Sequence, residues 1–256
     1  MTYEVRSLAV GETEVPGPEV FWMAAWDEWL PLTFQVALIR GPGVVALVNT
    51  GPPPDLTPID EVWTAALGER ARLRRSTEQE LVPALDRLGI EPDAVTHVLL
   101  TPLQLYTVGN VTRFPRATIC ISRKGWIHFH TTHDHPHDER WLSIDRETLV
   151  YLVTDAWSRV RLLDDEDTIA PGLRTWWCGV HHRASMVVEV ATAAGTVCIT
   201  DAFFYFENFE ERRPLGIGES LEEYERAAQR LSSGCDRLLP LYDPKVFDRY
   251  PDGIVA

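Results

Sequence analysis

The sequence has little positive charge: its 256 residues include 24 Lys and Arg against 38 Asp and Glu, which gives a net charge of −14 at pH 7. Nucleic acids are bound by neutralising their phosphates with basic side chains, so this balance argues against a nucleic-acid partner. Apolar runs are also short, and none approaches the roughly 18 to 20 residues of a membrane span. The first residues lack the basic and apolar regions of a secretory signal. We therefore expect a cytoplasmic protein without a nucleic-acid or membrane partner.

Cysteine is scarce as well. Cys120, Cys178, Cys198 and Cys235 lie far apart and form no C-x-x-C pair. Three of them have apolar neighbours, which favours reduced, buried thiols over a disulfide framework. The two short G-x-G sequences do not join a strand to a helix at the required spacing, so a dinucleotide cofactor is not supported.

Hydrophobic residues make up 45% of the chain, and charged residues 24%, which is typical of a globular protein. At this length the core is large, and we expect one domain over residues 1–256. Two apolar runs, Phe34 to Gly41 and Gly43 to Gly51, flank Gly41-Pro42-Gly43 and predict a β-hairpin. A second hairpin is predicted to turn at Ala194-Gly195.

The remaining elements alternate between helix and strand. Ser76 or Thr77 can begin a helix that ends near Leu88, with Glu80 placed for a capping box, although Pro83 falls inside it. Apolar spacing predicts a second helix from Ser220 to Leu231. Short strands are predicted at 96–101 and 117–123, and a final strand and loop at 238–244. The order indicates an α/β protein with two halves, each placing a sheet against a helix.

Four segments of the sequence then indicate a protein family. VALVNTG, THVLLTPLQLYTVGNVTRFPRATICISRKGW, GVHHRASMVVEVATAAGTVCITDAFFYFENFE and LLPLYDP follow one another along the chain. In order and distance they resemble the metallo-β-lactamase superfamily, within it the N-acyl homoserine lactonase branch. The resemblance implies an αβ/βα four-layer sandwich with an active site at one edge of the sheets. It also implies that a His-rich, aromatic segment of about 124–146 covers the pocket.

By the same resemblance, most positions that carry metal ligands in the family are occupied by other residue types in this chain. Where the family carries H-x-H-x-D-H, this chain has Pro102, Gln104, Tyr106 and Thr107. His181 matches a later ligand His, Asp201 matches the metal-bridging Asp, and Tyr242 stands where the last ligand His is expected. A catalytic zinc needs about three protein ligands, and Pro, Gln, Thr and neutral Tyr are poor replacements for imidazole and carboxylate. We therefore expect no two-metal site and no metal cofactor.

The His-rich segment keeps an alternative open, with one zinc or another transition metal. His128 and His130 would share one face of a strand, and His133, His135 and His137 follow closely. Composition alone does not establish a site, and a solvated loop explains the same residues.

The leading site hypothesis needs no metal. Asp201 would orient His181 as an acid or base, and Tyr106 and Tyr242 would donate protons or stabilise an oxyanion. The alternative is an inherited structural pair. The other candidates are expected to bind substrate: Gln104, Thr107, Phe204, Tyr205, Trp126, His128 and His130. Phe204 stands where the family has a catalytic Tyr, and Tyr205 follows it.

Three further expectations concern neighbouring residues. His182 would face away from His181 if both were on a strand, which suggests a surface role. Thr107 or Ser185 could act as a nucleophile only with a base in reach. Seven of the nine tryptophans form two groups. The first group is expected in the core or in a homodimer contact and consists of Trp22, Trp26 and Trp29. The second is expected along an apolar pocket and consists of Trp126, Trp141, Trp176 and Trp177.

Together these observations favour a metal-independent acid/base enzyme, a hydrolase, lyase or cyclase, acting on a small acyl- or aromatic-bearing molecule. Two alternatives stay open. One is a mononuclear metal-dependent hydrolase that uses the His-rich segment, and the other is a non-catalytic ligand-binding or scaffold protein.

Overall fold

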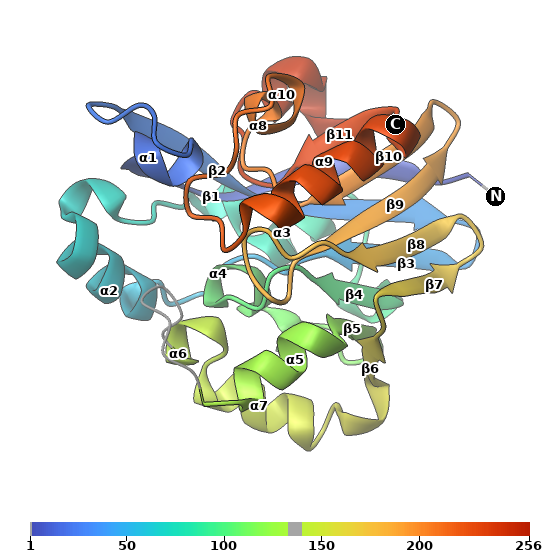
Figure 1. Cartoon of the computed structure of the whole chain (residues 1–256). Helices are drawn as coiled ribbons and strands as arrows, with labels where there is room; N and C mark the ends of the chain where they lie inside the picture. Colours follow the sequence, from blue (N-terminus) through green and yellow to red (C-terminus); the bar gives the residue numbers. More distant parts are fainter. Residues whose placement is uncertain (1, 133–139) are drawn as a thin grey trace.

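Two β-sheets lie face to face, with helices on their outer sides (Figure 1). The computed structural model describes residues 2–132 and 140–256. Within these ranges, no helix has the combined length and apolarity that crossing a membrane requires. The two inner sheet faces form one core of Val, Leu, Ile and aromatic side chains.

The first sheet has six strands in the order β1-β2-β3-β4-β5-β6. Its strands are β1 Glu4–Pro16, β2 Trp29–Gly41, β3 Val44–Val48, β4 His97–Leu100, β5 Thr118–Ser122 and β6 Val160–Leu163. β1 to β3 are antiparallel neighbours, and β3 to β6 run parallel. The predicted hairpin of β2 and β3 is confirmed, as are the strands at β4 and β5.

The second sheet has the order β11-β10-β9-β8-β7. Its strands are β7 Glu166–Ala170, β8 Leu173–Trp177, β9 Met186–Thr192, β10 Gly195–Thr200 and β11 Arg237–Pro240. β9 and β10 form the predicted hairpin around Gly195, and β11 joins β10 in parallel. The carboxyl ends of β10 and β11 therefore meet at one edge of the sheet, which is where the site is built.

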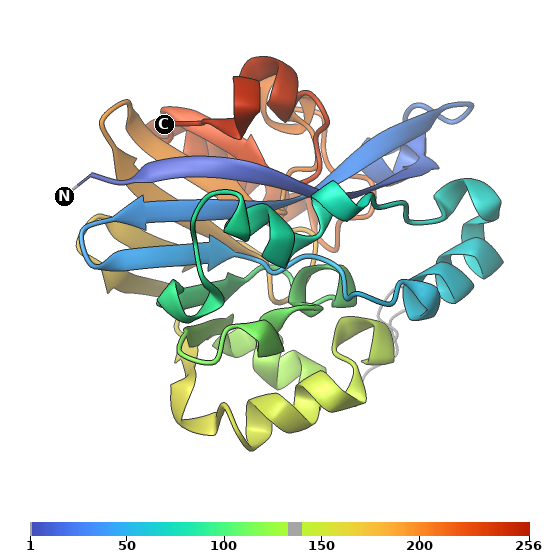
Figure 2. The ribbon, with the colours of Figure 1, turned by 180° about the vertical axis from the view of Figure 1, so that it is seen from behind.

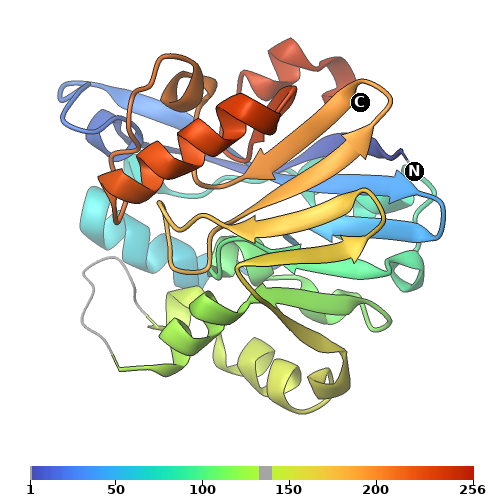
Figure 3. The same cartoon turned by 45° about the vertical axis from the view of Figure 1, so that its right-hand side comes forward.

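The helices cover the outer faces of both sheets. They are α1 Gly17–Val20, α2 Thr57–Leu67, α3 Leu81–Asp86, α4 Leu105–Val108, α5 Arg123–His130, α6 Arg140–Ser143, α7 Arg146–Val153, α8 Phe206–Glu210, α9 Leu221–Gly234 and α10 Val246–Arg249. Seen from behind, α3 lies against the sheet near β1 (Figure 2). Figure 3 shows α9 lying along the second sheet.

Helix α9 confirms the prediction made from spacing. Ser220 caps it by accepting a hydrogen bond from the Glu223 amide, and the buried face carries Tyr224, Ala228 and Leu231. The helix continues past Leu231 to Gly234.

The helix predicted from Ser76 to Leu88 is wrong as one continuous element. Glu80 has extended backbone angles and separates a short 3-10 turn, Thr77–Gln79, from α3. The capping box pairs Ser76 with Gln79, not with Glu80. Pro83 lies in the first turn of α3, where its missing N–H breaks no intrahelical bond.

Two further expectations fail in local structure. His128 and His130 lie on α5 and not on a strand, so their spacing no longer places them on one face. α1 ends at Val20, before the first tryptophan, and the side chains of Trp22 and Trp26 are 48% and 65% exposed. Neither belongs to the core; a contact between two copies of the chain stays a prediction.

Candidate active site

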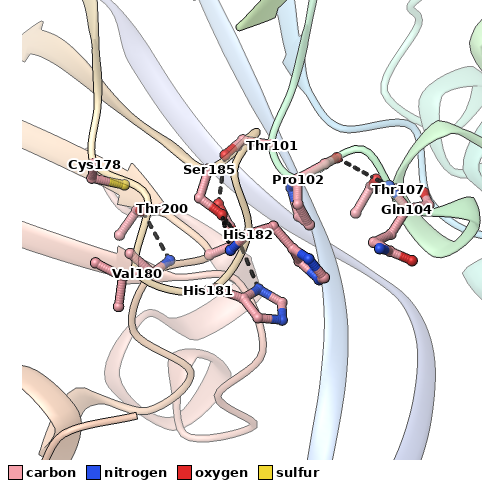
Figure 4. A network of polar contacts seen from close by, with 12 residues as sticks. Thr101, Pro102, Gln104, Thr107, Cys178, Val180, His181, His182, Ser185 and Thr200 are labelled. Carbon is pink, nitrogen blue, oxygen red and sulfur yellow. Dashed lines mark hydrogen bonds and ion pairs between the residues drawn. The ribbon is translucent and has the colours of Figure 1, made fainter. Parts of the chain in front are cut away.

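Four chain segments bring polar side chains to the strand ends at one edge of the two sheets. Asp201 follows β10 directly, Thr101 follows β4, and Tyr242 follows β11. His181 lies on the loop between β8 and β9. Figure 4 shows His181 and His182 on this loop, with Gln104 and Thr107 on the segment that faces it.

The Asp201 carboxylate is fully buried and accepts three hydrogen bonds. The hydroxyls of Thr101 and Ser185 donate to it, and the Nδ1 atom of His181 lies 3.1 Å from its Oδ2. A buried carboxylate is costly unless it is hydrogen-bonded in this way. The predicted pair of His181 and Asp201 is thus a direct contact.

Asp201 fixes which nitrogen of His181 is available. When Nδ1 carries the proton that is shared with the carboxylate, Nε2 holds a lone pair, and the side chain borders the cavity. The ring is only 3% exposed and is packed edge-on against Phe204 at a centroid distance of 4.7 Å. Packing and hydrogen bonding therefore hold the imidazole in one orientation.

The loop that carries His181 is anchored by helix α9. Glu223 accepts a hydrogen bond from the backbone N–H of Val180 and two from the guanidinium of Arg183. Burial favours a higher pKa for Glu223, but the hydrogen bonds from Arg183 and Val180 and the charge of Arg183 outweigh this effect. The net pKa of Glu223 is lowered below 4.5. Val180 itself has a positive φ of 70°, a conformation that needs such support.

His182 corrects the expectation of a surface role. The residue belongs to a turn and not to a strand, so consecutive side chains need not alternate. Its ring centroid lies 4.1 Å from that of His181, and both residues line the same cavity.

The cavity has a volume of about 250 Å³ and a largely apolar wall. Its polar members among the described residues are Thr13, Glu19, Gln104, Tyr106, His181, His182 and Tyr242. Aromatic side chains form much of the remainder: Phe34, Trp63 and Phe204. An apolar pocket with a few convergent polar groups is typical of small-molecule sites.

Tyr242 is the most unusual polar group in the wall. Its side chain is 2% exposed, and its hydroxyl forms no well-aligned hydrogen bond with any described residue. Burial raises its pKa well above 10, and the nearby Tyr106 and Asp201 add to the shift. The hydroxyl therefore stays protonated and can donate a hydrogen bond into the cavity.

No family model matches the sequence, and no curated protein does. Among solved structures, an N-acyl homoserine lactone hydrolase, described with the product N-hexanoyl-L-homoserine bound at its catalytic metal centre, aligns with a TM-score of 0.80. The alignment covers 98% of this chain and 97% of the other at 17% identity. The chain has the metallo-β-lactamase fold.

Two other solved structures support this assignment. A probable metal-dependent hydrolase from Staphylococcus aureus aligns with a TM-score of 0.76 at 14% identity, over 94% of this chain and 89% of its own. A hydrolase of the beta lactamase superfamily aligns with a TM-score of 0.69 at 13% identity, over 98% of this chain and 89% of its own. The predicted α/β sandwich and the resemblance to the lactonase branch are confirmed at the level of fold.

The described residues do not fit the metal centre that such a fold implies. They contain no group of three or more His, Cys, Asp or Glu side chains that could hold an ion. The Asp201 oxygens already accept bonds from Thr101, Ser185 and His181. His133, His135 and His137 of the alternative metal site lie outside the described residues.

The predicted substrate-binding residues divide into two groups. Gln104 and Phe204 line the cavity, as do the predicted catalytic residues Tyr106 and Tyr242. Thr107 and Tyr205 do not: the Thr107 hydroxyl donates to backbone carbonyls around α4, and the Tyr205 hydroxyl donates to the Pro31 carbonyl. Both hydroxyls are therefore used to hold backbone segments, and neither residue belongs to the cavity wall.

Helix α5 also stays outside the cavity wall. The wall contains neither Trp126 nor His130, whose Nδ1 lies 2.8 Å from the Trp126 carbonyl oxygen. His128 borders a separate space of only about 20 Å³. Of the segment expected to cover the pocket, the described residue in the wall is Leu142.

The pocket tryptophan is one that sequence reasoning missed. Trp63 of α2 lines the cavity, whereas the described wall includes none of Trp141, Trp176 and Trp177. Glu19 of α1 was missed as well. Neither residue belongs to a motif, and both reach the cavity only because α1 and α2 place them there.

Proposed function

We propose that this chain is a metal-independent acid/base hydrolase that cleaves an ester or lactone of a small, partly apolar molecule. The observation that carries the proposal is the contact between His181 Nδ1 and Asp201 Oδ2 at the wall of the cavity. A carboxylate at Nδ1 fixes the imidazole tautomer and stabilises the imidazolium that forms during proton transfer.

In this mechanism, His181 Nε2 takes a proton from water while the water oxygen attacks the carbonyl carbon. The carbonyl oxygen becomes an oxyanion, which the protonated Tyr242 hydroxyl stabilises by donating a hydrogen bond. The imidazolium then returns its proton to the leaving alkoxide, and the carbon–oxygen bond breaks. Atoms and charges balance, and no other reactant is consumed.

Water is the proposed nucleophile because the hydroxyls near His181 are engaged elsewhere. Ser185 is fully buried; its hydroxyl donates to Asp201 and accepts from the His182 amide. Thr107 is bonded to backbone groups around α4. A covalent intermediate on either side chain would require those bonds to break.

The test uses untagged protein, p-nitrophenyl butyrate and N-hexanoyl homoserine lactone, with and without a chelator. We expect His181→Ala to lower kcat by about 10² to 10⁴, the usual contribution of a general base. His97→Ala is the matched control, since His97 is the first residue of β4 and does not line the cavity. Activity that disappears with chelator and returns with zinc would refute the metal-independent mechanism. Tight ligand binding without turnover would favour the non-catalytic alternative.

A further inference from the structure

Glu19 contributes an acidic group to the cavity wall. Its carboxylate forms no hydrogen bond or ion pair with another described residue, and its backbone carbonyl accepts from the Ile217 amide. Burial alone raises the pKa of Glu19 to about 7. A carboxylate in such a setting gains stability from any cation that enters the cavity.

The rest of the described wall favours a positive ligand over a negative one. It contains no Lys or Arg, so an anionic ligand would find no fixed counter-charge. Phe34, Trp63 and Tyr106 form a connected aromatic group with centroid separations of 5.1 to 5.8 Å. Aromatic faces attract organic ammonium groups, and Trp and Tyr do so best.

We propose that the cavity takes an organic cation, an alkylammonium group that pairs with Glu19 and packs against Phe34, Trp63 and Tyr106. This inference rests on the proposed function: the substrate would be a small ester with a cationic group. The ammonium would lie toward α1 and α2, which carry Glu19 and Trp63, and the ester would lie toward His181 and Tyr242.

Among the described residues, four other titratable groups share the cavity with Glu19. His181 and His182 come from the loop after β8, Tyr106 from α4, and Tyr242 from the segment after β11. Protonated histidines would repel a cation. Their protonation would therefore weaken cation binding, as protonation of Glu19 would. Arg213 stacks on Phe21, and the described cavity wall does not include it.

The test compares acetylcholine with 3,3-dimethylbutyl acetate, in which carbon replaces the charged nitrogen. We expect the wild-type protein to prefer acetylcholine by at least tenfold in kcat/KM, from the ion pair and the cation–π contacts. Glu19→Gln should reduce this preference to nearly one. Glu14→Gln is the matched control and should leave the preference intact, because Glu14 pairs with Arg70 outside the cavity wall.

The ratio of the two esters also isolates the charge effect. The preference should rise between pH 6 and 8 in the wild type, because Glu19 ionises over this range, and the rise should be smaller in Glu19→Gln. His182→Gln measures the remaining contribution of that histidine. Equal kcat/KM values for the two esters in the wild type would overturn the cation site and leave the hydrolase proposal standing.

If neither ester is cleaved, binding separates the two proposals. Calorimetry with choline and its neutral isostere 3,3-dimethylbutanol then decides. Choline binding that is at least tenfold tighter, and weakened by Glu19→Gln, would retain the cation site while hydrolysis fails. Equal binding of choline and 3,3-dimethylbutanol, or no binding of either, would overturn the cation site.

Discussion

Replacing Tyr242 with Phe should make the protein more stable and less active. The hydroxyl is buried and has no well-aligned partner among the described residues. An unsatisfied buried polar group costs about 1–3 kcal/mol, so removing it should raise the free energy of unfolding by about 1 kcal/mol, after allowance for the small void. For a chain of this size, that is about 2–4 °C in Tm.

Tyr224→Phe is the matched control within the same molecule. Tyr224 is 1% exposed, but its hydroxyl donates a 2.6 Å hydrogen bond to the Asn208 carbonyl. Here the same substitution removes a bond and leaves a buried carbonyl without that donor. We expect the free energy of unfolding of Tyr224→Phe to fall by about 1–2 kcal/mol. The two Phe variants should therefore shift Tm in opposite directions.

Thermal unfolding and ester hydrolysis measure the two effects. Tyr242→Phe should lower kcat by about 10² to 10³, the usual effect of losing one oxyanion donor. A decrease in Tm similar to that of Tyr224→Phe would show that the hydroxyl is bonded within the folded protein. A gain in stability with unchanged kcat would refute its role in catalysis.

Three further predictions concern the support of the site. Asp201→Asn should cost about 3 kcal/mol, because an amide cannot accept all three bonds, and should lower kcat; unchanged urea unfolding would contradict this. Glu223→Gln should cost about 2 kcal/mol at pH 7. The lowered pKa of Glu223 means that its contribution is lost as pH falls below about 4.5, so unfolding curves of wild type and variant should converge there. Gly125→Ala would place a Cβ 2.3 Å from that of Ala184 and should cost about 1–3 kcal/mol, whereas Gly234→Ala, with open space around it, should be neutral or stabilising.

Sequence reasoning worked best where one local rule controls an element. Gly41-Pro42-Gly43 between two apolar runs predicted the hairpin of β2 and β3, and spacing with a Ser cap predicted α9. β1 was missed because a bulge between Ala9 and Gly11 shifts its register. At the bulge Leu8 and Ala9 are both half-buried and Val10 and Gly11 are both buried, so the two-residue alternation that signals a strand is interrupted.

The site itself could be predicted only in part. Resemblance to a family brought His181, Asp201, Tyr106 and Tyr242 together, and the structure places the first two in contact and all but the fully buried Asp201 in the cavity wall. Glu19 left no signal, because its role in the wall depends on how α1 packs. α5 was mistaken for a strand because His128 and His130 have two-residue spacing, yet Ser122 caps the helix by accepting a hydrogen bond from the Gly125 amide.

Asp201 shows how this fold can keep a buried carboxylate without relying on a nearby cluster of metal ligands. Its charge needs compensation wherever it is excluded from water, and here Thr101, Ser185 and His181 each supply a donor. Two of these donors are neutral hydroxyls, so only His181 can gain a positive charge beside the carboxylate. The compensation that stabilises Asp201 is thus the same interaction that orients the His181 ring.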